Sequence, residues 1–143
     1  MKKLVLAVLC TVLSAGLYAQ PQATFQYRGQ GCGWFQGQDL VVSHPPRIGQ
    51  YVEFRTHIPP YGTDFIALGS FDPQFPIGNG CKVRAFAFPG PTVIRIPFWF
   101  THRMAIPNDP ALAGFSIYAQ QLNYVWSGPT WETSRGVKLT LGY

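Results

Sequence analysis

The sequence predicts an all-β protein, namely an antiparallel β-sandwich of about eight strands with a jelly-roll or Ig-like arrangement. Apolar residues recur mostly with a period of two, which is the spacing of a strand that has one buried face. The 15 glycines and 13 prolines cluster between these segments, where they stop strands and form turns. No window of a dozen residues carries a sustained helical stripe, and 143 residues give room for one domain.

Residues 1–19 are predicted to be a secretory signal peptide. Two lysines follow the first methionine, an almost unbroken apolar run comes next, and small residues lead to Ala19. The apolar run is too short to span a bilayer comfortably. We expect cleavage after Ala19, with a cut near Gly16 as the alternative. The mature chain is then a single β-sandwich domain over 20–143. It is expected to be secreted or extracellular, at the cell surface or in the periplasm, without a transmembrane segment.

The clearest strand is predicted at 51–58. Val52 and Phe54 fall on one side of it, whereas Tyr51 and Glu53 fall on the other, so we expect one buried and one solvent-exposed face. Similar alternation predicts strands at 81–85, 94–98 and 137–141, and weaker patterns predict them at 23–28, 39–43, 64–69, 115–121 and 123–126. Turn chemistry separates them at 45–46, 59–62, 75–80 and 127–129.

One short helical turn is predicted at Asp109–Gly114. Asn108 or Asp109 can cap it by accepting a hydrogen bond from a backbone N–H group, and Pro110 suits the first helical position because no partner is needed for its nitrogen there. Gly114 can close the turn in a left-handed conformation, and Leu112 is expected to enter the core. The segment is therefore predicted to be a capped turn that leads into a strand.

Several motifs in this order resemble a family of secreted bacterial β-domains that carry an IPNDPALAG…YAQ motif and a C-terminal SxGxxxTxG motif. The matching segments are GC at 31–32, PRIG at 46–49, IPPYG at 58–62, LG at 68–69, GCKV at 80–83, IPNDPALAGFSIYAQ at 106–120 and SRGVKLTLG at 134–142. The resemblance covers essentially the whole mature chain. It implies secretion and an all-β fold. Because such domains generally lack an assigned activity and established catalytic residues, it implies no reaction.

Cys32 and Cys81 are the two cysteines that remain after removal of the leader. An even pair in an oxidising compartment predicts a disulfide bond. Closing this loop contributes on the order of 3 to 4 kcal/mol, mainly by restricting the unfolded chain. A metal site is not expected, because His44, His57 and His102 are scattered and lack ligand spacing.

The charge pattern argues against nucleic-acid binding. Without the two leader lysines, the count of 11 Lys and Arg falls to 9 against 6 Asp and Glu, a net charge of +3, and the cations are spread singly. No enzyme activity and no cofactor are predicted. The acidic residues show no shared cleft, and Ser127 and Ser134 lack the pattern of a nucleophile elbow.

Aromatic side chains are the best functional lead, because a sandwich of this size cannot bury all of them. The candidate interface or ligand residues are Trp34, Trp99, Trp126, Trp131, Tyr118 and Tyr124. Core packing, a protein interface and sugar stacking are the alternatives. We expect a non-catalytic structural or interaction module that assembles with itself or with another extracellular protein, at the cell surface or in the matrix. The alternative is a lectin-like module that binds polysaccharide.

Overall fold

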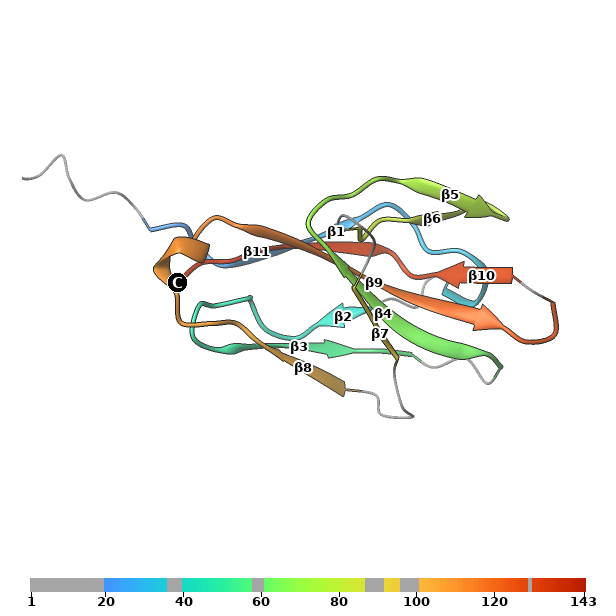
Figure 1. Cartoon of the computed structure of the whole chain (residues 1–143), viewed down its shortest axis with the longest axis horizontal. Helices are drawn as coiled ribbons and strands as arrows, with labels where there is room; N and C mark the ends of the chain where they lie inside the picture. The colour runs from blue at the N-terminus through green and yellow to red at the C-terminus, as the bar shows by residue number, and fades with distance from the viewer. Residues whose placement is uncertain (1–19, 36–39, 58–60, 87–91, 96–100, 129) are drawn as a thin grey trace, which may run out of the picture.

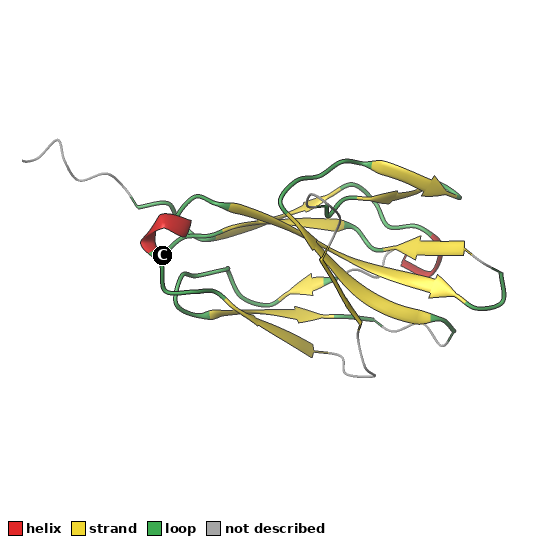
Figure 2. Cartoon of the chain, in the orientation of Figure 1, coloured by secondary structure: helices red, strands yellow, loops and turns green. Residues whose placement is uncertain are grey.

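The computed structural model describes residues 20–35, 40–57, 61–86, 92–95, 101–128 and 130–143, of which 92–95 are described by their backbone alone. Eleven strands and two 3-10 turns, η1 (Gly33–Phe35) and η2 (Pro110–Leu112), lie in these ranges (Figures 1 and 2). The strands are β1 (Thr24–Arg28), β2 (Val41–Val42), β3 (Tyr51–Arg55), β4 (Thr63–Gly69), β5 (Phe75–Gly78), β6 (Cys81–Val83), β7 (Thr92–Arg95), β8 (Thr101–Ala105), β9 (Ser116–Val125), β10 (Thr130–Thr133) and β11 (Gly136–Thr140).

The large sheet has the strand order β1-β11-β9-β4-β7, and β10 also pairs with β9. Its central strand, β9, pairs with β4 along one edge. Along the other edge it pairs first with β11 and then with β10, always antiparallel. The two strands predicted at 115–121 and 123–126 are thus one continuous strand. The small sheet has the order β2-β3-β8.

The main core lies between the two sheets, which confirms the all-β sandwich. Val52 and Phe54 of the small sheet pack with Ile66, Val137 and Leu139 of the large sheet. These residues alternate along their strands with side chains of the opposite face, as the period of two predicts. In Figure 1 the small sheet lies below β1, β11 and β9 of the large sheet.

A hairpin of β5 and β6 covers part of the other face of the large sheet (Figure 1). Beneath it, Ala67, Ala85 and Leu122 form a second apolar cluster. The predicted disulfide is confirmed: Cys32 and Cys81 are bonded, with their Cα atoms 5.3 Å apart. It joins the segment beside η1 to the start of β6, so the hairpin is held covalently as well as by packing.

Three strands, β5, β8 and β10, were not predicted. The sequence predicts a turn over the whole of 75–80, but the first four residues of this segment form β5. The turn itself is confined to the end of the segment, where Asn79 and Gly80 have φ values of 50° and 75°. Both β8 and β10 are short and carry polar residues among the apolar ones, so their alternation is weak.

The predicted helical turn is present as η2. Asp109 precedes it with an extended backbone, and its side chain accepts a hydrogen bond of 2.9 Å from the N–H of Ala111. Pro110 takes the first helical position, Gly114 has a φ of 82°, and Leu112 packs against the main core. Asn108 is exposed and does not form this cap.

Candidate functional site

The candidate site lies where β9 ends. Trp126 directly follows that strand and is 69% exposed. Its indole Nε1 donates a hydrogen bond of 3.1 Å to Oγ1 of Thr63, the first residue of β4. This bond favours one orientation of the ring, and most of the ring surface remains in solvent.

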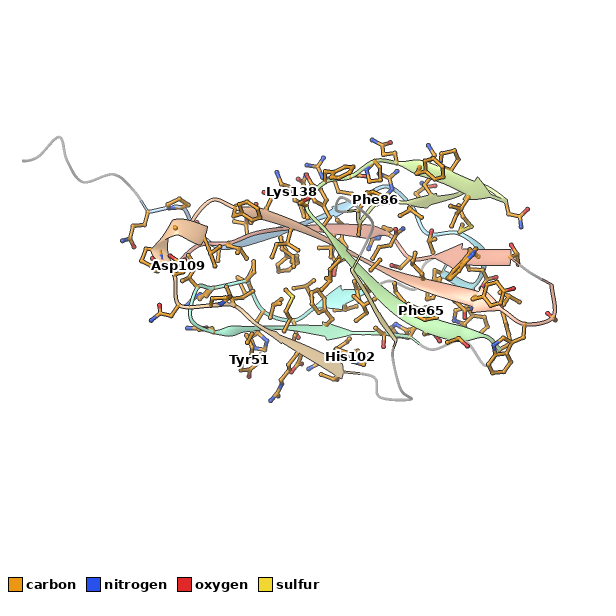
Figure 3. The ribbon with its side chains drawn as sticks, in the orientation of Figure 1. Tyr51, Phe65, Phe86, His102, Asp109 and Lys138 are labelled. Atoms are coloured by element: carbon orange, nitrogen blue, oxygen red, sulfur yellow. A yellow bond between two sulfur atoms is a disulfide. The ribbon has the colours of Figure 1, made fainter. Side chains whose placement is uncertain are left out.

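Three half-buried aromatic rings lie on the same side of the large sheet. Tyr124 stands opposite Thr63 on β4 and opposite Trp131 on β10, and side chains of paired residues share a face. The ring centroids of Tyr124 and Trp131 are 5.1 Å apart, and those of Trp131 and Phe65 are 5.9 Å apart. We call the set of Thr63, Phe65, Tyr124, Trp126 and Trp131 the end surface. Figure 3 labels Phe65 in the half of the molecule that lies away from Asp109.

Five of the six aromatic residues predicted as candidates lie in the described part of the chain, and they divide into three groups. Tyr124, Trp126 and Trp131 come together in the end surface. Tyr118 is half-buried against the second apolar cluster, as are Phe65 and Trp131, but it lies further along β9 from Trp126 than Tyr124 does. Trp34 is 36% exposed and meets Tyr61 edge to face at 6.0 Å, outside the end surface. The sixth candidate, Trp99, lies outside the described residues, as does the predicted signal peptide.

The opposite face of β9 carries a buried polar cluster beneath this end of the sheet. Nε2 of Gln121 donates to the carbonyl of His57 at 2.7 Å and to Oδ1 of Asp64 at 3.1 Å. Nδ2 of Asn123 donates to the carbonyl of Tyr61 at 3.2 Å and to a carboxylate oxygen of Glu132 at 3.3 Å. These bonds fix the chain on both sides of the connection from β3 to β4.

The charge of Glu132 acts on two neighbouring groups, the carboxyl group of Asp64 and the hydroxyl of Tyr61. Burial raises the pKa of Asp64 to about 6; the hydrogen bond from Gln121 opposes this shift, and the charge of Glu132 adds to it. Burial also raises the pKa of the Tyr61 hydroxyl, with further contributions from the charge and the hydrogen bond of Glu132. Asp64 is thus poised to change its protonation state in mildly acidic solution.

Sequence reasoning missed Thr63, Phe65 and the buried polar cluster. A signal for the cluster is present in the chain, because Gln120, Gln121 and Asn123 interrupt an otherwise apolar strand segment. All three are fully buried. Polar side chains inside a strand that is covered on both faces need partners. Asp64 of β4 and Glu132 of β10 supply part of them to Gln121 and Asn123, whereas Gln120 bonds to the backbone of Lys82, Arg84 and Ser134.

Comparisons with known proteins give no relative. No protein-family model, no curated protein and no solved structure matches the chain. Within the described ranges, no group of three or more His, Cys, Asp and Glu side chains is arranged to hold a metal ion. A separate search of the same residues finds no helix with the length and apolar character needed to cross a membrane.

Proposed function

We propose that this protein is a secreted, non-catalytic interaction module that associates with itself, or with another extracellular protein, through the end surface. The observation that carries the proposal is the exposure of Trp126, whose orientation is favoured by its hydrogen bond to Thr63. Exposed tryptophans that are held rigidly lose little entropy on binding and dominate the free energy of many protein interfaces. The rings of Tyr124 and Trp131 extend the same apolar surface.

Two features support a location outside the cytoplasm. The disulfide between Cys32 and Cys81 is of the kind that persists in oxidising compartments. The first 19 residues have the charge and apolar pattern of a secretory leader. Association with the cell surface or the extracellular matrix is the setting that fits both features.

Self-association is tested by sedimentation velocity and light scattering over a series of protein concentrations. We expect the mass to rise with concentration, and Trp126→Ala to weaken the association about thirtyfold, since an interface tryptophan contributes about 2 kcal/mol or more. The matched control is Phe115→Ala. Phe115 is 53% exposed and lies just before β9 begins, at the opposite end of that strand.

A mass that never exceeds that of the monomer rules out self-association. Equal weakening by Trp126→Ala and Phe115→Ala shows that the association does not depend on the end surface. Pull-down of a defined extracellular partner by wild type, lost in Trp126→Ala alone, identifies the partner as a different protein.

Carbohydrate binding is the second candidate for the same surface. Neutral hydrogen-bonding groups lie close to its residues. They are the hydroxyl of Thr63 and the side chains of Asn79 and Thr130, which are joined by a hydrogen bond of 3.0 Å. Aromatic rings beside such groups are suited to stacking on sugars. Retention of the wild type on a neutral polysaccharide column, with early elution of Trp126→Ala, favours this alternative. If neither the wild type nor Trp126→Ala is retained on the column, this alternative is rejected.

A further inference from the structure

The outer face of the small sheet carries two arginines that share one glutamate. Nε of Arg103 donates to Oε2 of Glu53 at 3.1 Å, and Nε of Arg55 approaches Oε1 at 3.4 Å. The glutamate side chain is only 7% exposed, whereas the arginine side chains are 62% and 63% exposed. Glu53 was expected on a solvent-exposed face. It is covered because both arginines, together with Ser43, close around its carboxylate.

These contacts position the two guanidinium groups and use only one nitrogen of each. Each meets Glu53 through Nε, so their terminal amino groups stay available to other ligands. The Arg103 guanidinium also lies 4.7 Å from the ring centre of Tyr51, which is itself exposed, and His44 meets that ring edge to face. Figure 3 places Tyr51 on the outer side of the small sheet. We call Tyr51, Glu53, Arg55 and Arg103 the arginine face.

The arginine face has an excess of positive charge. One carboxylate serves two arginines there, and the other acidic residues of the described chain are engaged elsewhere. Asp64 and Glu132 belong to the buried polar cluster, Asp72 pairs with Arg84 at 3.1 Å, and Asp109 caps η2. The hydrogen bond from Arg103 holds the pKa of Glu53 below its ordinary value, so the arrangement persists at neutral pH.

We propose that the arginine face binds the carboxylate or sulfate groups of an acidic polysaccharide. Guanidinium groups bind such oxyanions in paired, planar geometry. Arg103 lies over one face of the Tyr51 ring, and the part of the ring that stays exposed offers a surface for the sugar to which the acid is attached. This combination suits an acidic sugar better than a bare anion. This site is separate from the end surface and does not depend on the function proposed for it.

Titration calorimetry with heparin and with polygalacturonate tests the proposal, with neutral dextran as the polymer control. We expect binding to both acidic polymers that weakens with added salt, and no heat with dextran. The double variant Arg55→Gln/Arg103→Gln is expected to lose at least tenfold in affinity. The matched control is Lys82→Gln/Lys138→Gln, which removes the same charge; Figure 3 shows Lys138 on the opposite side of the molecule from Tyr51. This control should change the affinity less than threefold.

The single variants Arg55→Gln and Arg103→Gln each leave Glu53 one arginine partner, so they test the site even where the double variant fails to fold. Each should lose affinity on its own. Equal losses of affinity in the double arginine variant and the double lysine variant would mean that only net charge matters, which overturns the proposal. A wild-type protein that binds neither acidic polymer also overturns it. Tighter, arginine-dependent binding to anionic phospholipid vesicles overturns the choice of a polysaccharide. Loss in Trp126→Ala but not in the arginine variants assigns the sugar to the end surface instead.

Discussion

Asp64 ties the stability of the molecule to pH at the scale of a single residue. Burial raises its pKa from an ordinary value of 3.8 to about 6. The folded state therefore holds the proton more tightly than the unfolded chain does, and stability increases as the pH falls through 6. We expect the free energy of unfolding, measured with urea, to be about 1 kcal/mol larger at pH 5 than at pH 7 on account of this group.

The variant Asp64→Asn isolates that contribution. Its side-chain oxygen still accepts the hydrogen bond from Gln121 but does not titrate, so the gain between pH 7 and pH 5 should shrink by that amount. Glu53 does not interfere, because its lowered pKa affects stability only at more acidic pH, where protonation removes its contribution. An unchanged pH dependence in Asp64→Asn would show that other groups cause it.

The β5–β6 hairpin is the element that depends most on a single covalent bond. Among the described residues, the second apolar cluster beneath it contains only Ala67, Ala85 and Leu122 as buried members, and the disulfide joins Cys81 of β6 to Cys32. Replacing both cysteines by serine should lower the free energy of unfolding by about 3 to 4 kcal/mol. Hydrogen exchange should accelerate more in β5 and β6 than in β3. Uniform acceleration across both sheets would contradict a local anchoring role.

The η2 turn depends on its cap. Asp109→Ala removes the side-chain oxygen that accepts the hydrogen bond from Ala111, which should lower the free energy of unfolding by about 1 kcal/mol. Asp109→Asn retains an acceptor and should cost much less. Thermal unfolding of the two variants side by side measures the difference, and equal losses would mean that the charge of Asp109 matters more than its hydrogen bond.

Strands with a regular apolar alternation were predictable, whereas strands without one were missed or divided, whether exposed as in β5 and β8 or buried as in β9. The alternation of Val137, Leu139 and Leu141 identified β11 because their partners in sequence remain partly exposed. In β9 both faces are buried, one by the small sheet and one by the hairpin, so its alternation is lost at Gln120 and Gln121. The period of two therefore predicts the sandwich but not the third layer.

The candidate site was predictable in its residue types but not in its grouping. Excess aromatics pointed to Tyr124, Trp126 and Trp131, yet only the register of β4, β9 and β10 brings them together. The strand register places Tyr118 further along β9, where it packs against the second apolar cluster. The pairing of Glu53 with Arg103 also joins residues 50 positions apart, so no local pattern reveals it.

The whole molecule presents two distinct surfaces on a rigid framework. The end surface is apolar and extends around Trp126, and the arginine face lies on the outer side of the small sheet (Figure 3). Both surfaces are built on paired strands, so their backbone is already ordered before a partner binds. Pre-organisation of this kind lowers the entropic cost of association.

The central claim, that Trp126 is the contact residue of the module, is tested most directly by fluorine NMR. The chain has four tryptophans, so 5-fluorotryptophan labelling gives four signals, and the variant Trp126→Phe identifies one of them. As the protein concentration rises, the average molecular mass should increase, and the Trp126 signal should shift or broaden over the same range of concentration. A mass that rises while the Trp126 signal stays unchanged would contradict the claim.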